Sequence, residues 1–207
     1  MSNGKSENIK SCIILCGGKS SRMGRDKGSM IVHGTPMIKH ILSTLNHQIN
    51  EAIIVLNNKE RIEKYSEFIN PEDYTYSLTF VEDKIKNKGP LPGIMTGLSN
   101  ITGDYALVLP CDSPYVTQNY IETIFNEIEK SYQAIVPYHD AENKIKTSEP
   151  LHSVYNKNVV GIIDDLIGED ILHIKGLIEK IDTKFVLIDN KKIEKKEFRN
   201  LNRPSDI

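Results

Sequence analysis

The sequence predicts an α/β fold of three layers, in which a mostly parallel sheet is covered by helices on both faces. Short apolar runs alternate with segments whose apolar residues recur at helical spacing, as far as Val136. Unusual polar residues also follow directly on four of the predicted strands, after Leu15, Leu56, Val81 and Leu109. Ligands of open parallel sheets bind outside the carboxyl ends of the strands, so this edge is where we expect the site.

The first half of the chain supplies most of the predicted sheet. Its apolar runs predict strands at residues 12–15, 29–32, 52–56, 78–81 and 105–109. Thr35 is expected to cap a helix that has Pro36 at its first position and one buried stripe. Further helices are expected at residues 59–68 and 94–101, and Thr117 is expected to cap a helix that continues to Ile128.

The alternation weakens after the next predicted strand, at residues 133–136. Residues 139–149 are polar and predict a connection or a hairpin. Strands are expected at residues 151–155, 185–188 and 198–202, and helices at residues 159–167 and 172–181. We expect this part to complete the same cleft, so that residues 1–207 form a single domain.

Composition excludes several classes of protein. The chain has 207 residues and a formal net charge of -2, so no global field attracts nucleic acid or a membrane. It contains no apolar stretch of membrane-spanning length, and its first residues lack the apolar core of a signal peptide. Three cysteines without a C-x-x-C pair predict a reducing, cytoplasmic location. Of these, Cys12 and Cys16 are expected to be small core residues.

A glycine-rich loop at residues 15–28 is the main functional signal. It contains four glycines (Gly17, Gly18, Gly24 and Gly28) and four cations (Lys19, Arg22, Arg25 and Lys27), directly after a predicted strand. Flexible backbone amides and concentrated positive charge suit a polyphosphate. The loop is not a P-loop, because Ile13 occupies the position of the first glycine, and adjacent Gly17 and Gly18 exclude the G-x-G-x-x-G fingerprint.

Polar residues at the ends of the other strands are candidate ligands. Asp112, in the turn Pro110-Cys111-Asp112-Ser113-Pro114, is a candidate ligand of Mg²⁺, because this ion needs only one or two carboxylates besides phosphate oxygens and waters. Alternatively, the Asp112 side chain caps its own turn. Asp83 could assist the metal, bind the nucleotide or cap a loop, and Asn57 could contact a base edge or only terminate a strand. The proline-rich turn at residues 89–93 leads to a helix N-terminus, which suits an anion.

The last predicted strand carries two amides on one face, Asn200 and Asn202. They could bind a pterin edge or a phosphate, but taken alone they are better explained as outward positions of an edge strand. The six histidines form no metal-binding or catalytic pattern.

The loop, with the pattern L-x-G-G-x-S-x-R-M-G-x-D-K, resembles the signature of nucleotidyltransferases, and from Ile13 to Asp206 the chain resembles molybdenum cofactor guanylyltransferases. Further matching segments are residues 34–36, 54–57, 81–83, 89–94, 109–115 and 200–204. Gly17-Gly18 and the Gly-Pro-Leu turn favour the guanylyl-transferring branch over its cytidylyl-transferring relatives. Cys16 departs from the alanine that is usual at its position.

The resemblance implies a Rossmann-like fold of the nucleotide-diphospho-sugar transferase type, with a nucleotide-binding half at about residues 9–138 and a pterin-side half at about residues 139–207. It implies GTP binding by Leu15, Cys16, Gly17, Lys27, Asn57, Asp83 and Asp112, with Gly18 adding close backbone approach. It also implies that Asp112 holds Mg²⁺, which with Arg22 and Lys27 makes the catalytic set, and that Asn200 and Asn202 lie on the molybdopterin side.

The expected reaction transfers GMP from GTP to the terminal phosphate of molybdopterin or the molybdenum cofactor. We also expect contacts with molybdoenzymes or other cofactor-assembly proteins, and none with nucleic acid or membranes. Two alternatives remain at this point: a related transferase that uses CTP or a sugar phosphate, and a nucleotide-sensing module that transfers nothing.

Overall fold

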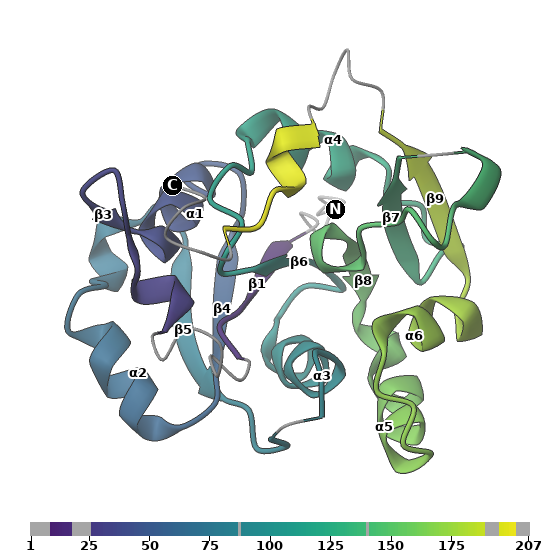
Figure 1. Ribbon diagram of the computed structural model, residues 1–207, viewed down its shortest axis with the longest axis horizontal. Helices are drawn as coiled ribbons and strands as arrows, with labels where there is room; N and C mark the ends of the chain where they lie inside the picture. The colour runs from purple at the N-terminus through teal and green to yellow at the C-terminus, as the bar shows by residue number, and fades with distance from the viewer. Residues whose placement is uncertain (1–8, 18–25, 87, 140, 189–194, 202–207) are drawn as a thin grey trace, which may run out of the picture.

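The computed structural model describes residues 9–17, 26–86, 88–139, 141–188 and 195–201, and its main feature is a seven-stranded sheet of order β5-β4-β1-β6-β8-β7-β9 (Figure 1). Its strands are β1 (Lys10–Leu15), β4 (Glu51–Leu56), β5 (Ser77–Glu82), β6 (Tyr105–Pro110), β7 (Ala134–Tyr138), β8 (Val154–Asn156) and β9 (Thr183–Leu187). Two further short strands, β2 (Ile31–Val32) and β3 (Thr35–Pro36), form a separate hairpin.

The sheet is mostly parallel, as the sequence predicts. Strand β1 lies between β4 and β6 and pairs with both in parallel, and the pairs β4–β5 and β7–β9 are parallel too. Only β8 runs against its neighbours, β6 and β7. The register places Leu15 opposite Val55 on one side and Pro110 on the other, so the ends of three strands meet at one edge.

Helices cover both faces of this sheet. They are α1 (Met37–Thr44), α2 (Lys59–Ser66), α3 (Leu91–Asn100), α4 (Gln118–Asn126), α5 (Val160–Gly168) and α6 (Ile174–Lys180). Short 3-10 helices lie at η2 (Lys27–Ser29), η3 (Pro71–Asp73), η4 (Ala141–Asn143), η5 (Pro150–His152), η6 (Lys157–Val159) and η7 (Lys195–Phe198). Figure 1 shows α3, α5 and α6 along one side of the strands and α4 on the other.

Each face has its own apolar core. One cluster joins side chains of α1, α2 and α4 to one face of the strands, and another joins α3, α5 and α6 to the opposite face. Strand β1 shows why: Cys12 and Ile14 belong to the first cluster and Ile13 to the second, since successive strand residues point to opposite faces. All three residues are fully buried, and three layers follow from this alternation. Cys12 and Cys16 are buried free thiols, as expected.

The prediction that Thr35 caps the first helix is wrong. Thr35 pairs with Val32 across the turn at His33 and Gly34, and both turn residues have positive φ, of 48° and 80°. A two-residue turn of this kind matches the twist of a hairpin, so the chain forms β2 and β3 there. Helix α1 therefore begins one residue after Pro36.

Other boundaries also differ from the sequence-based expectation. The strand expected at residues 151–155 begins only at Val154, because η5 occupies residues 150–152. Helix α3 begins at Leu91, three residues before the expected start, because Pro92 fits the first turn of a helix, where no backbone donor is needed. The strand expected at residues 198–202 is wrong for the described part: η7 ends at Phe198, and Asn200 lies in an irregular segment.

Contacts with residues far away in the sequence hold η7 and the irregular segment after it in place. The Leu201 N–H donates to the Asp112 carbonyl oxygen at 2.8 Å, and Thr117 Oγ1 donates to Glu197 Oε2 at 2.7 Å. The first of these bonds satisfies a backbone N–H that a strand would have paired. Over the residues that the structure describes, no helix combines the length and apolarity needed to cross a membrane.

Candidate active site

A cavity of about 640 Å³ lies at the carboxyl ends of the central strands. The described residues that the sequence predicts for the site all line it: Leu15, Cys16, Gly17, Lys27, Asn57, Asp83, Asp112 and Asn200. They come from the ends of β1, β4, β5 and β6, from η2 and from the segment after η7. Three predicted residues, Gly18, Arg22 and Asn202, lie outside the described part of the chain.

An ion pair crosses the cavity between the two strongest candidates. Lys27 Nζ lies 2.8 Å from Asp112 Oδ2, although the residues are 85 positions apart in the chain. Lys27 begins η2, and Asp112 follows directly on β6. The Asp112 side chain is 13% exposed and that of Lys27 31%, so the cation faces the cavity while partly shielded from water. A lysine ammonium held in this way is a ready partner for phosphate oxygens.

Gly17 lies so close to Asn57 that any side chain at this position would displace the Asn57 carboxamide. A Cβ placed on it would lie 2.7 Å from Oδ1 of Asn57, closer than Cβ atoms come to other atoms in proteins. The backbone of the loop and the carboxamide of Asn57 therefore meet at one wall of the cavity. Cys16 reinforces the junction, because its N–H donates to the Val55 carbonyl oxygen at 2.9 Å.

Asp83 is fixed beside the same wall. Its Oδ1 accepts from the Ile85 N–H at 3.0 Å and from Thr96 Oγ1 at 3.4 Å. Burial raises the pKa of the Asp83 carboxyl above its ordinary value, although these hydrogen bonds and Lys86 oppose the shift. Asp83 thus caps its loop, as one of the sequence-based alternatives holds, and at the same time lines the cavity.

Two thiols line the floor of the cavity. Burial, followed by the adjacent Cys111 thiol, raises the pKa of Cys16 well above its ordinary value. Cys16 therefore remains a neutral thiol and acts as a small apolar residue. Cys111 follows β6, and its N–H donates to the Leu15 carbonyl oxygen at 3.1 Å, which aligns the loops after β1 and β6.

A second charged cluster was not expected from the sequence. Asp26 Oδ1 lies 2.6 Å from an Arg61 guanidinium nitrogen and accepts from the Tyr65 hydroxyl at 2.8 Å. Asp26 and Arg61 both line the cavity, and a Cβ on Gly28 would come within 2.3 Å of the Tyr65 hydroxyl. The cluster fastens the end of the signature loop, and so Lys27, to α2.

A signal for this cluster was present in the sequence. Asp26 is the only acid among the loop cations, and Arg61 and Tyr65 are four residues apart, on one face of a helix. The helix follows Asn58, whose side chain accepts from the Arg61 N–H at 2.9 Å and caps it.

The last predicted ligand in the described region is Asn200. Its Oδ1 accepts from Ser113 Oγ at 2.5 Å, and the residue lines the cavity beside Leu151. Asp112, which also lines the cavity, is the residue predicted to hold the metal. Within the described ranges, no three His, Cys, Asp or Glu side chains converge closely enough to form a metal cluster.

A mostly parallel sheet whose carboxyl edge carries a lysine–aspartate pair and Gly17 against Asn57 is the arrangement of a Rossmann-like α/β protein that binds a nucleotide there. Residues 12–183 match the family described as MobA-like NTP transferase domain, and the chain belongs to this family. It is therefore an enzyme of the nucleotidyltransferase class.

Relatives in this family cover nearly the whole chain. A Methanothermobacter thermautotrophicus protein named "Probable molybdenum cofactor guanylyltransferase" is 34% identical over 202 residues, which span 96% of this chain and 98% of that protein. The molybdenum cofactor guanylyltransferase of Aliivibrio fischeri is 30% identical and is covered to 93%, with 95% of this chain aligned.

The fold is shared with solved structures. Molybdopterin-guanine dinucleotide biosynthesis protein A from Archaeoglobus fulgidus superposes with a TM-score of 0.74 at 24% identity, over 96% of this chain and 94% of that one. A 4-diphosphocytidyl-2C-methyl-D-erythritol synthase from Anaerococcus prevotii gives 0.70 at 15% identity, over 96% of this chain and 92% of its own. These similarities show the Rossmann-like fold predicted for this chain.

Proposed function

We propose that this enzyme transfers GMP from GTP to the terminal phosphate of molybdopterin or the molybdenum cofactor, giving the guanine dinucleotide cofactor and pyrophosphate. The observation that carries the proposal is the Lys27–Asp112 pair in a cavity that gathers all the described residues predicted for the nucleotide. The names of relatives that are 34% and 30% identical over nearly the whole chain support molybdopterin as the acceptor.

The reaction is an in-line displacement at phosphorus. A phosphate oxygen of the acceptor bonds to the α-phosphorus of GTP, the bond from that phosphorus to the bridging oxygen breaks, and pyrophosphate leaves. The attacking oxygen is already anionic, so no strong general base is needed. The main barrier is the repulsion between anions, which fixed positive charge reduces.

Lys27 is the described cation that serves this purpose. Its ammonium reaches the cavity from η2 and is aligned by Asp112 at 2.8 Å. When a triphosphate binds, the ammonium can exchange Asp112 for phosphate oxygens and stabilise charge on the leaving group. Arg22, which lies outside the described residues, would add a second cation from the same loop.

Mg²⁺ is the metal that this site suits. Hard oxygen ligands are what Mg²⁺ requires, and it binds through one or two carboxylates, with substrate phosphates and waters completing its shell. Asp112 offers such a carboxylate at the cavity wall, and its partner Lys27 can move to the phosphates. Mg²⁺ would supply charge neutralisation for the triphosphate.

The nucleotide base would lie against Asn57 and Asp83. Both side chains line the cavity on the β4–β5 side, away from Asn200. A carboxylate can accept from the N–H groups of guanine, and a carboxamide can both donate and accept. Asn200, and Asn202 beyond the described part, would lie toward the acceptor.

Pyrophosphate release tests the proposal most directly. The purified chain is given each of the four nucleoside triphosphates with Mg²⁺, with and without molybdopterin. We expect release that requires both GTP and molybdopterin. Release with CTP instead would replace the proposal by a cytidylyl transfer, and release with a sugar phosphate in place of molybdopterin would change the acceptor.

A further inference from the structure

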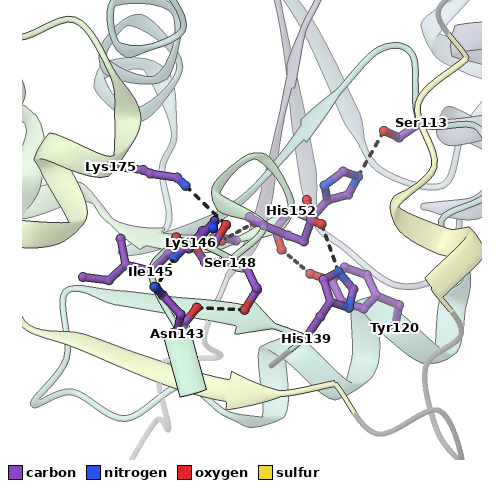
Figure 2. A network of polar contacts seen from close by, with 12 residues as sticks. Ser113, Tyr120, His139, Asn143, Ile145, Lys146, Ser148, His152 and Lys175 are labelled. Atoms are coloured by element: carbon purple, nitrogen blue, oxygen red, sulfur yellow. Dashed lines mark hydrogen bonds and ion pairs between the residues drawn. The ribbon is translucent and has the colours of Figure 1, made fainter. Parts of the chain in front are cut away.

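A chain of hydrogen-bonded side chains leads from the protein interior to the acceptor side of the cavity. His152 Nε2 lies 3.0 Å from Ser113 Oγ, which in turn lies 2.5 Å from Asn200 Oδ1. His152 and Ser113 are buried, at 1% and 0% exposed, whereas Asn200 lines the cavity. Figure 2 shows the His152 ring directed at Ser113 (Figure 2).

The distances fix the direction of the bonds. At 2.5 Å the contact between Ser113 Oγ and Asn200 Oδ1 lies at the short end of the range for O–H···O bonds and below the range for N–H···O bonds. Ser113 therefore donates its hydroxyl proton to the carbonyl oxygen of Asn200, and the carboxamide has its oxygen turned inward. Since a hydroxyl has one proton, the bond at 3.0 Å from His152 to Ser113 must be donated by Nε2–H.

The state of the His152 ring agrees with this direction. Burial, and to a smaller extent nearby His139, lowers the pKa of His152 to about 3, so the ring is neutral and carries one N–H. Nδ1 has no hydrogen-bond partner and is buried. When the proton is on Nε2, the buried Nδ1 has only a lone pair without a hydrogen-bond partner. The other tautomer would bury an N–H group at Nδ1 without an acceptor, so the tautomer with the proton on Nε2 is favoured.

Packing holds the ring in place. The Tyr120 hydroxyl donates to the His152 carbonyl oxygen, and the His152 N–H donates to the Glu149 carbonyl oxygen at 2.9 Å. The Phe198 ring lies edge-on at 5.1 Å from the His152 ring, and at 5.2 Å from that of Tyr120. His152, the last residue of η5, is therefore fixed by α4, η7 and the backbone at Glu149, which is more than a solvent-facing side chain requires.

We propose that His152 and Ser113 are positioning residues that hold the Asn200 carboxamide with its NH₂ group facing the cavity. The carboxamide then presents N–H donors to an oxygen of the acceptor substrate, a phosphate or a ring carbonyl. This assignment rests on the proposed function, because the acceptor enters through the Asn200 side of the cavity. Asn200 would thus bind the acceptor, while His152 and Ser113 act through it.

The first test measures the ring tautomer in the full chain. Long-range ¹⁵N–¹H correlation spectra of histidine-labelled protein at pH 7 should show His152 protonated at Nε2 only. Ser113→Ala should shift the signal of the His152 Nε2, which donates to Ser113, whereas Ser153→Ala should leave this ring signal in place. Ser153 is a matched control, since it is equally buried and donates to the Glu149 carbonyl oxygen at 2.8 Å without touching Asn200. An Nδ1–H tautomer in the wild type would overturn the proposal.

The second test separates the two substrates. Asn200→Asp keeps an acceptor for Ser113 but removes the N–H donors, so it should raise the KM for molybdopterin by about tenfold or more. The KM for GTP should stay within about twofold. Ser113→Ala and His152→Phe should raise the acceptor KM by about three- to tenfold, because the carboxamide can then rotate. His152→Gln, which restores an N–H, should recover most of the loss.

A double variant distinguishes positioning from general damage. In an Asn200→Ala background, Ser113→Ala should have no further effect on the acceptor KM, since no carboxamide remains to be held. An undiminished effect there, or equal rises in both KM values, would overturn the proposal. If the wild type transfers no nucleotide to molybdopterin, the proposed function fails, and the acceptor role of Asn200 fails with it. If the wild type does transfer nucleotide but the Asn200 and Ser113 variants have an unchanged KM for the acceptor, only the positioning role is refuted.

Discussion

Adding one methyl group at Gly17 should weaken nucleotide binding through Asn57. A Cβ at Gly17 would lie 2.7 Å from Asn57 Oδ1, so in Gly17→Ala the carboxamide must move away. The backbone of the variant can stay in place, because the obstructing atom is the end of a flexible side chain. We therefore expect the fold to survive and the KM for GTP to rise.

The size of the effect follows from the contacts that a displaced carboxamide loses. Leaving a buried hydrogen-bonding group without its partner costs about 1–3 kcal/mol. At about 1.4 kcal/mol for each factor of ten, the KM for GTP should rise about 5- to 150-fold. Steady-state pyrophosphate release at varied GTP, with molybdopterin saturating, measures it. Gly161→Ala is the control, since a Cβ at Gly161 would have open space around it.

A double-mutant cycle tests the cause. If Gly17→Ala acts by displacing Asn57, its effect should fall to within about 0.5 kcal/mol of zero in an Asn57→Ala background. Additive effects would show that Gly17 acts in another way, through its own backbone contacts with phosphate. An unchanged KM in Gly17→Ala would refute the assignment of Asn57 to the nucleotide.

The remaining predictions concern catalysis and stability. Lys27→Ala and Asp112→Asn should each lower turnover by about 10²–10³ at saturating Mg²⁺, since each removes one preorganised electrostatic group; near-normal turnover in both variants would contradict the mechanism. Gly28→Ala should lower the free energy of unfolding by about 1–3 kcal/mol in urea titrations, because a Cβ 2.3 Å from the Tyr65 hydroxyl forces that ring to shift; an unchanged midpoint would show that the ring moves freely. The pKa of His152 is about 3 in the folded chain and 6.5 for the free side chain, so at lower pH the unfolded chain binds a proton that the folded chain does not. The contribution of His152 to the stability of the folded chain is therefore complete above pH 6.5 and is lost as the pH falls. Between pH 7 and pH 5 this loss should be about 2 kcal/mol in wild type and absent in His152→Phe, and equal losses in both would contradict it.

The sequence alone determined the main architecture and most of the site. Alternating apolar runs and helical stripes predict the three layers, because burial on both faces leaves period-2 and period-3.6 patterns in the chain. The site was also predictable, since parallel strands bring their carboxyl ends to one edge. Local rules failed at Thr35, where a hairpin turn outweighed helix capping, and at the described residues 198–201, where contacts with distant residues outweighed strand propensity.

Only the tertiary structure decided which partners each site residue meets. The 2.8 Å pair of Lys27 with Asp112 joins residues 85 positions apart, and the contact of Asp26 with Arg61 joins residues 35 apart. Such pairs depend on how strands and helices pack, and the residue pattern along the chain does not give the distance between two residues that are far apart in it. The six histidines form no metal-binding or catalytic pattern in the sequence, and only packing places His152 in a buried position against Ser113. The sequence determined which chemical groups reach the edge of the sheet, and packing determined the hydrogen-bond and ion-pair partners of each group.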